Sequence, residues 1–350
     1  MQTYRFTLRP LSAFGTPLAG DTLFGQMCWT LRHQLGNARL SELLHGYTAG
    51  KPFAVLSDAL PVGHVPLPHV PSEVWQKSTE TAAPDRKVLK KKKWLPSAAL
   101  NQTFASWQAS AHSDAEVAEP LITAWAALGT QRDTKASSHT ERAQPHNTIK
   151  RQTGTTGEGQ FAPYAMPQIW FHPAMQFDIY VVLDDARLSL AALTLALTAM
   201  GQTGFGRDAS IGLGKFELVG EAALNNLRNE GVAPTGRAAS TLGTPNSYLT
   251  LGSCAPQGLG FCPVRSFYQV ATRFGRHGDM AVQSGQPFKR PVLLAKAGAV
   301  FWPETLDASG QFIGQGLGGA VNPMSLTMPE TVQQGYAPVI AITRPVEKTA

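Results

Sequence analysis

Apolar and polar positions at the start of the chain follow the period of a strand and then that of a helix. Residues 2–8 alternate, which predicts a strand with one buried face. Over residues 23–35 the apolar positions recur at helical spacing, and Gly36 ends the run. Asp21 or Thr22 stands where the N-cap of this helix is expected.

A strand closes this first unit, and the order of strand, helix and strand then returns after a long interval. Residues 53–60 predict a second strand, residues 175–183 a third, residues 189–200 a strong helix, and residues 216–219 a closing strand. The pattern is therefore strand–helix–strand, a long insertion, and again strand–helix–strand. That is the order of a ferredoxin-like (RRM-like) fold.

A second block of strands follows residues 220–246, whose glycines and prolines are typical of a linker. Convincing helical patterns are scarce in this block, and strands are predicted at residues 248–251, 267–274, 291–302 and 335–343. The expected fold class is α+β. The first domain is expected at residues 1–222, its insertion at about residues 64–165, and a β-rich second domain at residues 245–345.

The insertion is rich in proline and then in basic residues. Residues 109–128 predict a helix, and residues 129–159 have the polar, basic composition of a long loop or mobile hairpin. A basic run such as the four lysines at residues 90–93 can bind nucleic acid, although such runs are more often solvated.

Composition narrows the classes of function. The net charge of +6 and a pI near 9.3 favour an anionic partner, most often nucleic acid. The three cysteines form no C-x-x-C pair, which argues against a disulfide framework or a zinc ribbon. The N-terminus lacks the pattern of a signal peptide, and the apolar stretch at 188–200 is too short to cross a bilayer. We therefore expect a cytoplasmic protein with no membrane contact, no metal and no cofactor.

The loop at residues 204–215 is the strongest candidate site. Its glycines allow positive φ and the close approach of a phosphate or base, while its basic side chains supply charge and its phenylalanine could stack on a base. The alternative is a glycine C-cap and a tight turn with the phenylalanine in the core. The candidate RNA-binding residues are Gly204, Phe205, Gly206, Arg207, Ser210, Gly212, Gly214 and Lys215.

A polar, basic segment at residues 146–154 is the second candidate. Lys150 and Arg151 could hold phosphates, and His146 and Asn147 could bond bases or sugars, although a solvated loop is equally consistent with the pattern.

Glycines at residues 314–319 formally match G-x-G-x-x-G, but no helix pattern follows them. A dinucleotide site is therefore rejected, and a loop that contacts a backbone stays open.

Catalytic signals are weak. His33 lies in the first helix pattern and could serve as a general base in an RNA-cleaving relative, but a surface histidine without a partner is the better interpretation. Asp21 is better explained as a helix cap than as an acid or metal ligand. We expect no enzyme activity and no catalytic residue.

Several segments together resemble one family, the RAMP proteins that cap the type III-A (Csm) CRISPR effector. The matching segments are residues 18–25 with Trp29, residues 56–61 (SDALP), residues 146–151 (N-x-I-x-R), the glycine-rich residues 204–216, residues 287–291 (FKxPV) with Ala297-Gly298, and Gly335-Tyr336. Residues 66–128 and 314–319 depart from the pattern, which leaves a neighbouring type III subtype open.

This resemblance implies two ferredoxin-like RAMP domains with a thumb-like insertion in the first. It implies a non-catalytic subunit of an antiviral ribonucleoprotein complex that holds the repeat-derived 5′ handle of the crRNA. The implied partners are this crRNA, target RNA near the 5′ end of the guide, a large Cas10-type subunit and a backbone RAMP subunit. Gly20, Thr22, Lys289 and Arg290 join the candidate RNA-binding residues on this ground, and the thumb is expected within residues 129–159.

Two other functions stay open. One is a crRNA-processing endoribonuclease of the same superfamily, with His33 as its base. The other is a β-rich protein that binds polysaccharide or nucleotide.

Overall fold

In the computed structural model, residues 1–75, 86–129, 137–224 and 243–345 are described. The first sheet has the strand order β2-β8-β1-β9, with every neighbouring pair antiparallel and the short β3 beside β8. The strands are β1 (Gln2–Pro10), β2 (Ala54–Leu56), β3 (Leu60–Pro61), β8 (Phe177–Leu183) and β9 (Phe216–Leu224). The mixed order of helices and strands predicted from the periodicity is confirmed.

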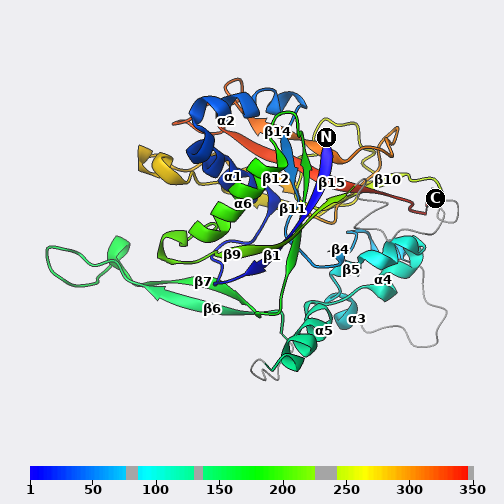
Figure 1. Ribbon diagram of the computed structural model, residues 1–350, viewed down its shortest axis with the longest axis horizontal. Coiled ribbons are helices and arrows are strands. Elements are labelled where there is room, and N and C mark those ends of the chain that lie inside the picture. The colour runs from blue at the N-terminus through cyan, green and yellow to red at the C-terminus, as the bar shows by residue number, and fades with distance from the viewer. Residues whose placement is uncertain (76–85, 130–136, 225–242, 346–350) are drawn as a thin grey trace.

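Helices α1 (Gly20–Leu35) and α6 (Leu190–Thr203) pack against each other and against this sheet (Figure 1), and the short α2 (Asn37–Leu44) follows α1. The core between them contains fully buried Phe6, Leu23 and Leu197.

The expected N-cap was wrong. Helix α1 begins at Gly20, whose N–H donates to the Asp58 side chain over 2.8 Å, and Asp21 lies buried in the first turn.

The second sheet has the order β13-β10-β15-β14, and a separate hairpin pairs β11 with β12. These strands are β10 (Ser247–Thr250), β11 (Val270–Arg273), β12 (Val292–Ala295), β13 (Val300–Phe301), β14 (Phe312–Gly318) and β15 (Val332–Ile342). Residues 243–345 hold no α-helix, only the 3₁₀ turn η8 (Asp279–Ser284), which confirms that this half is β-rich. The glycines at 314–319 lie mainly in β14, so the expectation of a loop there was wrong.

Buried hydrogen bonds join the two sheets. The Gln334 side chain on β15 accepts from the Leu56 N–H over 2.9 Å and donates to the Leu56 carbonyl over 2.8 Å. The Tyr336 hydroxyl donates to the carbonyl of Tyr47, in the 3₁₀ turn η1 (Tyr47–Ala49), over 2.6 Å. Such bonds satisfy polar groups that would otherwise be costly to bury.

The insertion forms two structures. One is a compact unit of β4 (His64–Pro66), β5 (Trp94–Pro96), α3 (Arg86–Leu89), α4 (Trp107–Ser110) and α5 (Asp114–Ala127), with the 3₁₀ turns η2 (Ser72–Val74), η3 (Ser97–Asn101) and η4 (Phe104–Ser106). The other is a hairpin of β6 (His139–His146) and β7 (Tyr164–Phe171), which projects from the body (Figure 1) and carries η5 (Gly159–Phe161) beyond its paired strands.

Part of the lysine run supports the compact unit. Lys92 pairs with Glu116 and Lys93 with Asp114, both in the first turn of α5, at 3.1 and 2.9 Å. These two lysines therefore anchor a helix, which favours a structural role for this end of the run.

Candidate nucleic-acid interface

The glycine-rich loop changes direction at residues whose backbone has a left-handed conformation. Gly204, Gly206, Gly212 and Gly214 all have positive φ, between 73° and 99°, and Asp208 joins them at 64°. The 3₁₀ turn η6 (Ala209–Ile211) lies between them. Only glycine takes such conformations at little cost, so the sequence spacing encodes the shape of this loop.

Three of the four glycines are required by contacts inside the protein. A Cβ at Gly204 would lie 2.3 Å from the Leu213 carbonyl oxygen, and one at Gly214 would lie 2.1 Å from that of Phe205. A Cβ at Gly206 would lie 2.6 Å from Thr16. Gly212 differs, because the position of its absent Cβ has no atom within 4 Å. The open part of the loop is therefore its outer turn.

Side chains from two other segments hold the loop in place. Gln26 of α1 donates to the Gly204 carbonyl over 2.7 Å and accepts from the Gly206 N–H over 2.9 Å. Thr16 accepts from the Arg207 N–H over 2.9 Å, and Ser12 accepts from the Lys215 N–H over 2.9 Å. Many of the loop's inward donors and acceptors are thus occupied, and it is a rigid, preformed surface.

Phe205 does not face solvent. Its side chain is fully buried in the core of the first sheet. The expectation that it stacks on a base was wrong, and the alternative of a core residue holds. Ser210, Ile211 and Lys215 are the exposed side chains of this loop.

Arg207 joins the loop to the projecting hairpin. Its guanidinium donates to the Pro167 carbonyl of β7 over 2.5 Å and lies 3.5 Å from the Asp208 carboxylate. The side chain is about one-third exposed. The glycine-rich loop is therefore joined directly to the middle of the hairpin, where Pro167 pairs with Ala143.

One face of the hairpin carries aromatic rings beside polar and basic groups. His146 and Tyr164 lie opposite each other with parallel rings, 5.3 Å between centroids and 9° between planes. Farther along the same face, the Arg142 guanidinium lies 5.6 Å from the centre of the Trp170 ring. Tyr164 and Trp170 are half-exposed.

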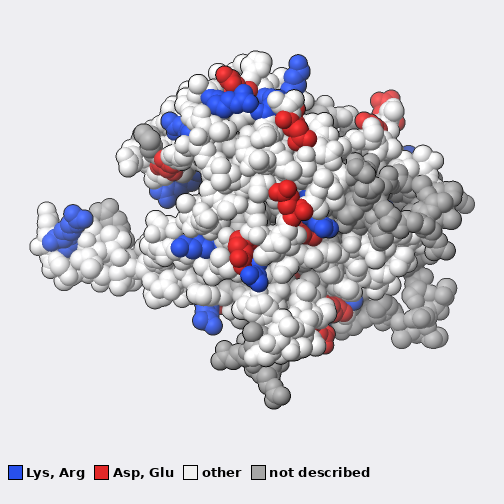
Figure 2. All heavy atoms as spheres, in the orientation of Figure 1, with Lys and Arg blue, Asp and Glu red and all other residues white. Residues whose placement is uncertain are grey.

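The far end of the hairpin is basic. Asn147, Lys150 and Arg151 are exposed there, and the segment turns tightly through a Lys150–Thr155 bridge. Figure 2 shows Lys and Arg atoms at this projecting end. The structure therefore groups the four predicted residues of segment 146–154 on one extension.

The residues predicted on the grounds of family resemblance fall in different environments. Gly20 is buried, and its N–H donates to Asp58, whereas Thr22, two residues later in the same turn, is half-buried. Arg290 is exposed. Lys289 points inward toward Cys28 and Asp21, and burial lowers its pKa. Gly20 and Lys289 thus make their contacts inside the protein, which the linear sequence did not reveal.

A buried ion pair missed by the sequence reading lies beside them. Arg273 of β11 approaches the Asp21 carboxylate at 3.2 Å, and Gln333 of β15 donates to the same carboxylate over 3.4 Å. Burial raises the pKa of Asp21, and Arg273 opposes that rise. Burial also raises the pKa of nearby Asp58 to about 6. The pairing spans the two halves of the chain, so no local sequence signal announces it.

His33 has a partner that the sequence did not show. Its Nε2 contacts the Asp279 carboxylate, and the imidazole is more than half exposed. Asp279 begins η8 with a φ of 54°. No group of three metal-ligating side chains occurs among the described residues.

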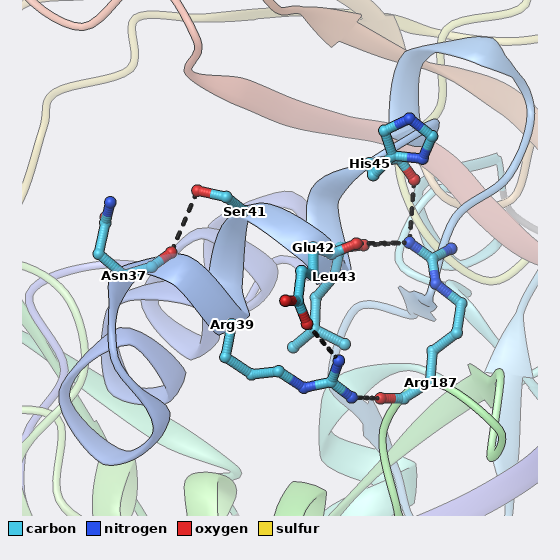
Figure 3. Close-up of polar contacts among 7 residues, drawn as sticks. All are labelled: Asn37, Arg39, Ser41, Glu42, Leu43, His45 and Arg187. Atoms are coloured by element: carbon cyan, nitrogen blue, oxygen red, sulfur yellow. Dashed lines mark hydrogen bonds and ion pairs between the residues drawn. The ribbon is translucent and has the colours of Figure 1, made fainter.

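Figure 3 shows how Arg187 closes the end of α2. Its guanidinium donates to the carbonyls of Glu42, Leu43 and His45, and Arg39 donates to the carbonyl of Arg187 itself. The Arg187 guanidinium also donates to the Lys51 carbonyl. A cavity of about 430 Å³ adjoins this cluster. Because the Arg187 donors are occupied by backbone carbonyls, we assign this cavity no ligand.

No model of a protein family and no curated protein matches this chain. Solved structures match along its whole length. A chain of a Csm3–Csm4 subcomplex of the type III-A CRISPR-Cas interference complex aligns with 98% of this chain and 100% of its own length, at TM-score 0.59 and 13% identity. Chains of Csm1–Csm4 cassettes, one in complex with pppApA and one with AMPPNP, align at TM-scores of 0.55 and 0.54, with 13% and 14% identity and 99% of this chain covered. They cover 99% and 100% of those chains.

The chain has the fold of Csm4. The resemblance inferred from scattered motifs is thereby confirmed for the fold, at an identity too low for whole-sequence matching. None of the helices among the described residues is long and apolar enough to cross a membrane.

Proposed function

We propose that this chain is an RNA-binding, non-catalytic subunit of a type III CRISPR effector complex. The observation that carries the proposal is the match to Csm4 over nearly the full length of both chains. In this proposal each half is a ferredoxin-like RAMP domain, and β1, α1, β2, β8, α6 and β9 supply the complete unit of the first. The strand order β2-β8-β1-β9 supports this interpretation.

The glycine-rich loop at residues 204–215 is the proposed binding site for the 5′ handle of the crRNA. Ser210 and Lys215 are exposed on it, and Gly212 leaves room for a phosphate to approach the backbone. The proposed role of Arg207 is double, because its guanidinium is partly exposed while it donates to the Pro167 carbonyl in the middle of β7. A preformed loop loses little conformational entropy on binding.

The β6–β7 hairpin is the proposed thumb. Its aromatic face, with Tyr164 and Trp170, offers stacking surfaces for bases or sugars, and Lys150 and Arg151 offer charge at the far end. We propose that it contacts the guide–target duplex near the 5′ end of the guide. The proposed protein partners are a Cas10-type large subunit and a backbone subunit, because the matched structures contain Csm4 with Csm1 or with Csm3.

Binding to a repeat-derived handle RNA tests this function. Replacing Ser210 and Lys215 by Ala should weaken handle binding and flatten its salt dependence, since one phosphate contact fewer lowers the slope by about 1. Replacement of exposed Lys51, near η1 and outside both candidate segments, is the charge-matched control. Equal effects from loop and control variants would contradict the loop assignment.

A second candidate, a crRNA-processing endoribonuclease, is favoured by one observation, the contact between exposed His33 and Asp279. A carboxylate that orients an imidazole is an arrangement suited to general base catalysis. Incubating the chain with repeat RNA separates the two proposals. Site-specific cleavage that is lost in both His33→Ala and Asp279→Asn would establish this activity and overturn the non-catalytic role.

A further inference from the structure

The hairpin formed by β11 and β12 turns charged side chains toward the interior and large apolar side chains toward solvent. Along residues 270–277 the side chains alternate between two faces. On the opposite strand residues 288–290 and residues 292–294 alternate in the same way, with a one-residue slip in register between the two stretches. The inward face carries Arg273, His277 and Lys289. The outward face carries Val270, Phe274, Phe288 and Leu293, each between 54% and 75% exposed.

The charged inward face is fully explained by contacts within the chain. Arg273 meets Asp21, and His277 hydrogen-bonds to Ser325 over 2.7 Å. Lys289 lies close to Asp21 and Cys28. The exposed apolar face has no such explanation, and an exposed group of large apolar side chains usually marks a binding surface.

The end of this face nearest η8 is aromatic and cationic. Arg276 pairs with Phe288 across the hairpin, and its guanidinium lies 5.8 Å from the centre of the Phe288 ring. Phe274 and Arg290 are exposed beside them. Exposed aromatic rings interleaved with arginine form a stacking platform for unpaired bases, since every base offers a flat π-face. The opposite end of the face, with Val270 and Leu293, is aliphatic.

The distribution of charge along the chain selects the kind of ligand. Residues 231–303 contain seven Lys or Arg residues and one acidic residue, Asp279. This segment therefore carries a net charge of +6, equal to that of the whole chain, and the remaining residues balance at 23 of each sign. Arg273 and Lys289 face inward toward Asp21. The other five cations still exceed the single acidic residue of the segment that contains the aromatic platform, which favours a polyanion over an apolar protein surface.

We propose that Phe274, Arg276, Phe288 and Arg290 form a second site that binds single-stranded RNA by stacking on its bases, without reading its sequence. This site is distinct from the glycine loop and from the β6–β7 hairpin. The inference rests on the proposed RNA-binding function for its biological setting. Of its four residues, Arg290 is also a candidate on the ground of the family resemblance, while the ligand, unpaired RNA of any sequence, differs from the repeat-derived handle.

Fluorescence anisotropy with a labelled oligouridylate tests the proposal. A length of about ten nucleotides matches common single-strand site sizes, and the probe contains no repeat sequence. The variant Phe274→Ala/Phe288→Ala should bind about tenfold or more weakly, as expected for the loss of two stacking rings. The matched control is Val270→Ala/Leu293→Ala, which trims two similarly exposed side chains on the same face. It should bind as the wild type does.

Arg276 separates stacking from charge. Arg276→Lys keeps the charge, so the slope of affinity against salt should stay near the wild-type value while affinity falls. Crosslinking of a 4-thiouridine probe should label the peptides that contain Phe274 and Phe288. Unaltered thermal unfolding of each variant confirms its fold, which is expected because the replaced side chains are exposed.

The outcomes distinguish this site from the proposed function. Oligouridylate binding that depends on the two rings, together with absent handle binding, would sustain the second site and overturn handle recognition. Handle binding that persists while oligouridylate affinity is equal in all variants would overturn the second site alone. The proposal is likewise overturned if both double variants leave RNA affinity unchanged and weaken association with a Cas10-type or backbone subunit, because that result identifies the face as a protein interface.

Discussion

Replacement of Arg273 by Met should destabilise the protein through the charge that it leaves behind. The Asp21 side chain is 4% exposed, and Arg273 is the cation that contacts it. Removing one partner of a buried ion pair costs about 3–5 kcal/mol. Because the Arg273 side chain is itself 30% exposed, solvent offsets part of this loss. We therefore expect a decrease of about 2–3 kcal/mol in the free energy of unfolding at pH 7.

The pH dependence gives this prediction its sign. Burial raises the pKa of Asp21 above its usual value, so folding favours the protonated form. Without Arg273 that pKa rises further, and the ionised carboxylate costs more. The difference in stability between wild type and Arg273→Met should therefore be largest at neutral pH and shrink as the pH falls and Asp21 becomes protonated.

Urea denaturation followed by tryptophan fluorescence measures the effect, with the double variant Asp21→Asn/Arg273→Met as the control. Removing the buried charge as well should recover most of the lost stability. A double variant as unstable as Arg273→Met would refute the reasoning, because the loss would then come from the packing of the arginine stem and not from an uncompensated charge.

Two further predictions concern buried residues in the first half of the chain. Phe205→Ala should lower the free energy of unfolding by about 3–5 kcal/mol, since it empties a fully buried site, while Phe205→Leu should keep handle binding. Handle binding lost in a stably folded Phe205→Leu would restore the stacking role. Asp58, whose pKa is raised to about 6, should make the wild type lose stability as the pH rises from about 4 to 6, and Asp58→Asn should remove that part of the curve. A thermal-unfolding series in which both proteins follow the same pH curve would contradict this assignment.

Hydrophobic periodicity located the principal helices and most of the strands because each has one buried face. It failed where distant residues decide the environment. Asp21 looked like a helix cap, but its partner Arg273 is more than 250 residues away in sequence. Gly316 looked like part of a loop, although it lies in β14, where a Cβ would approach the Tyr47 carbonyl at 2.5 Å.

The candidate site was predictable to the same extent. The glycines of residues 204–215 revealed the positive φ angles, since glycine is chosen for that conformation. The direction of an aromatic or basic side chain was not encoded locally. Phe205 and Lys289 turn inward because the surrounding core and Asp21 receive them, and neither fact can be read from neighbouring letters.

The bond between Arg207 and Pro167 braces the projecting hairpin part-way along its strands, because Pro167 belongs to the fifth of eight register pairs counted from the body. Eight paired residues on each strand extend about 26 Å, at the usual rise per residue of a strand. Three register pairs lie beyond the Arg207 contact, so more than half of the paired length is supported against the body. The exposed basic end with Lys150 and Arg151 lies beyond this support. The loop that carries Arg207 therefore presents its own outer turn and also braces the hairpin, so the two candidate surfaces share one structural anchor.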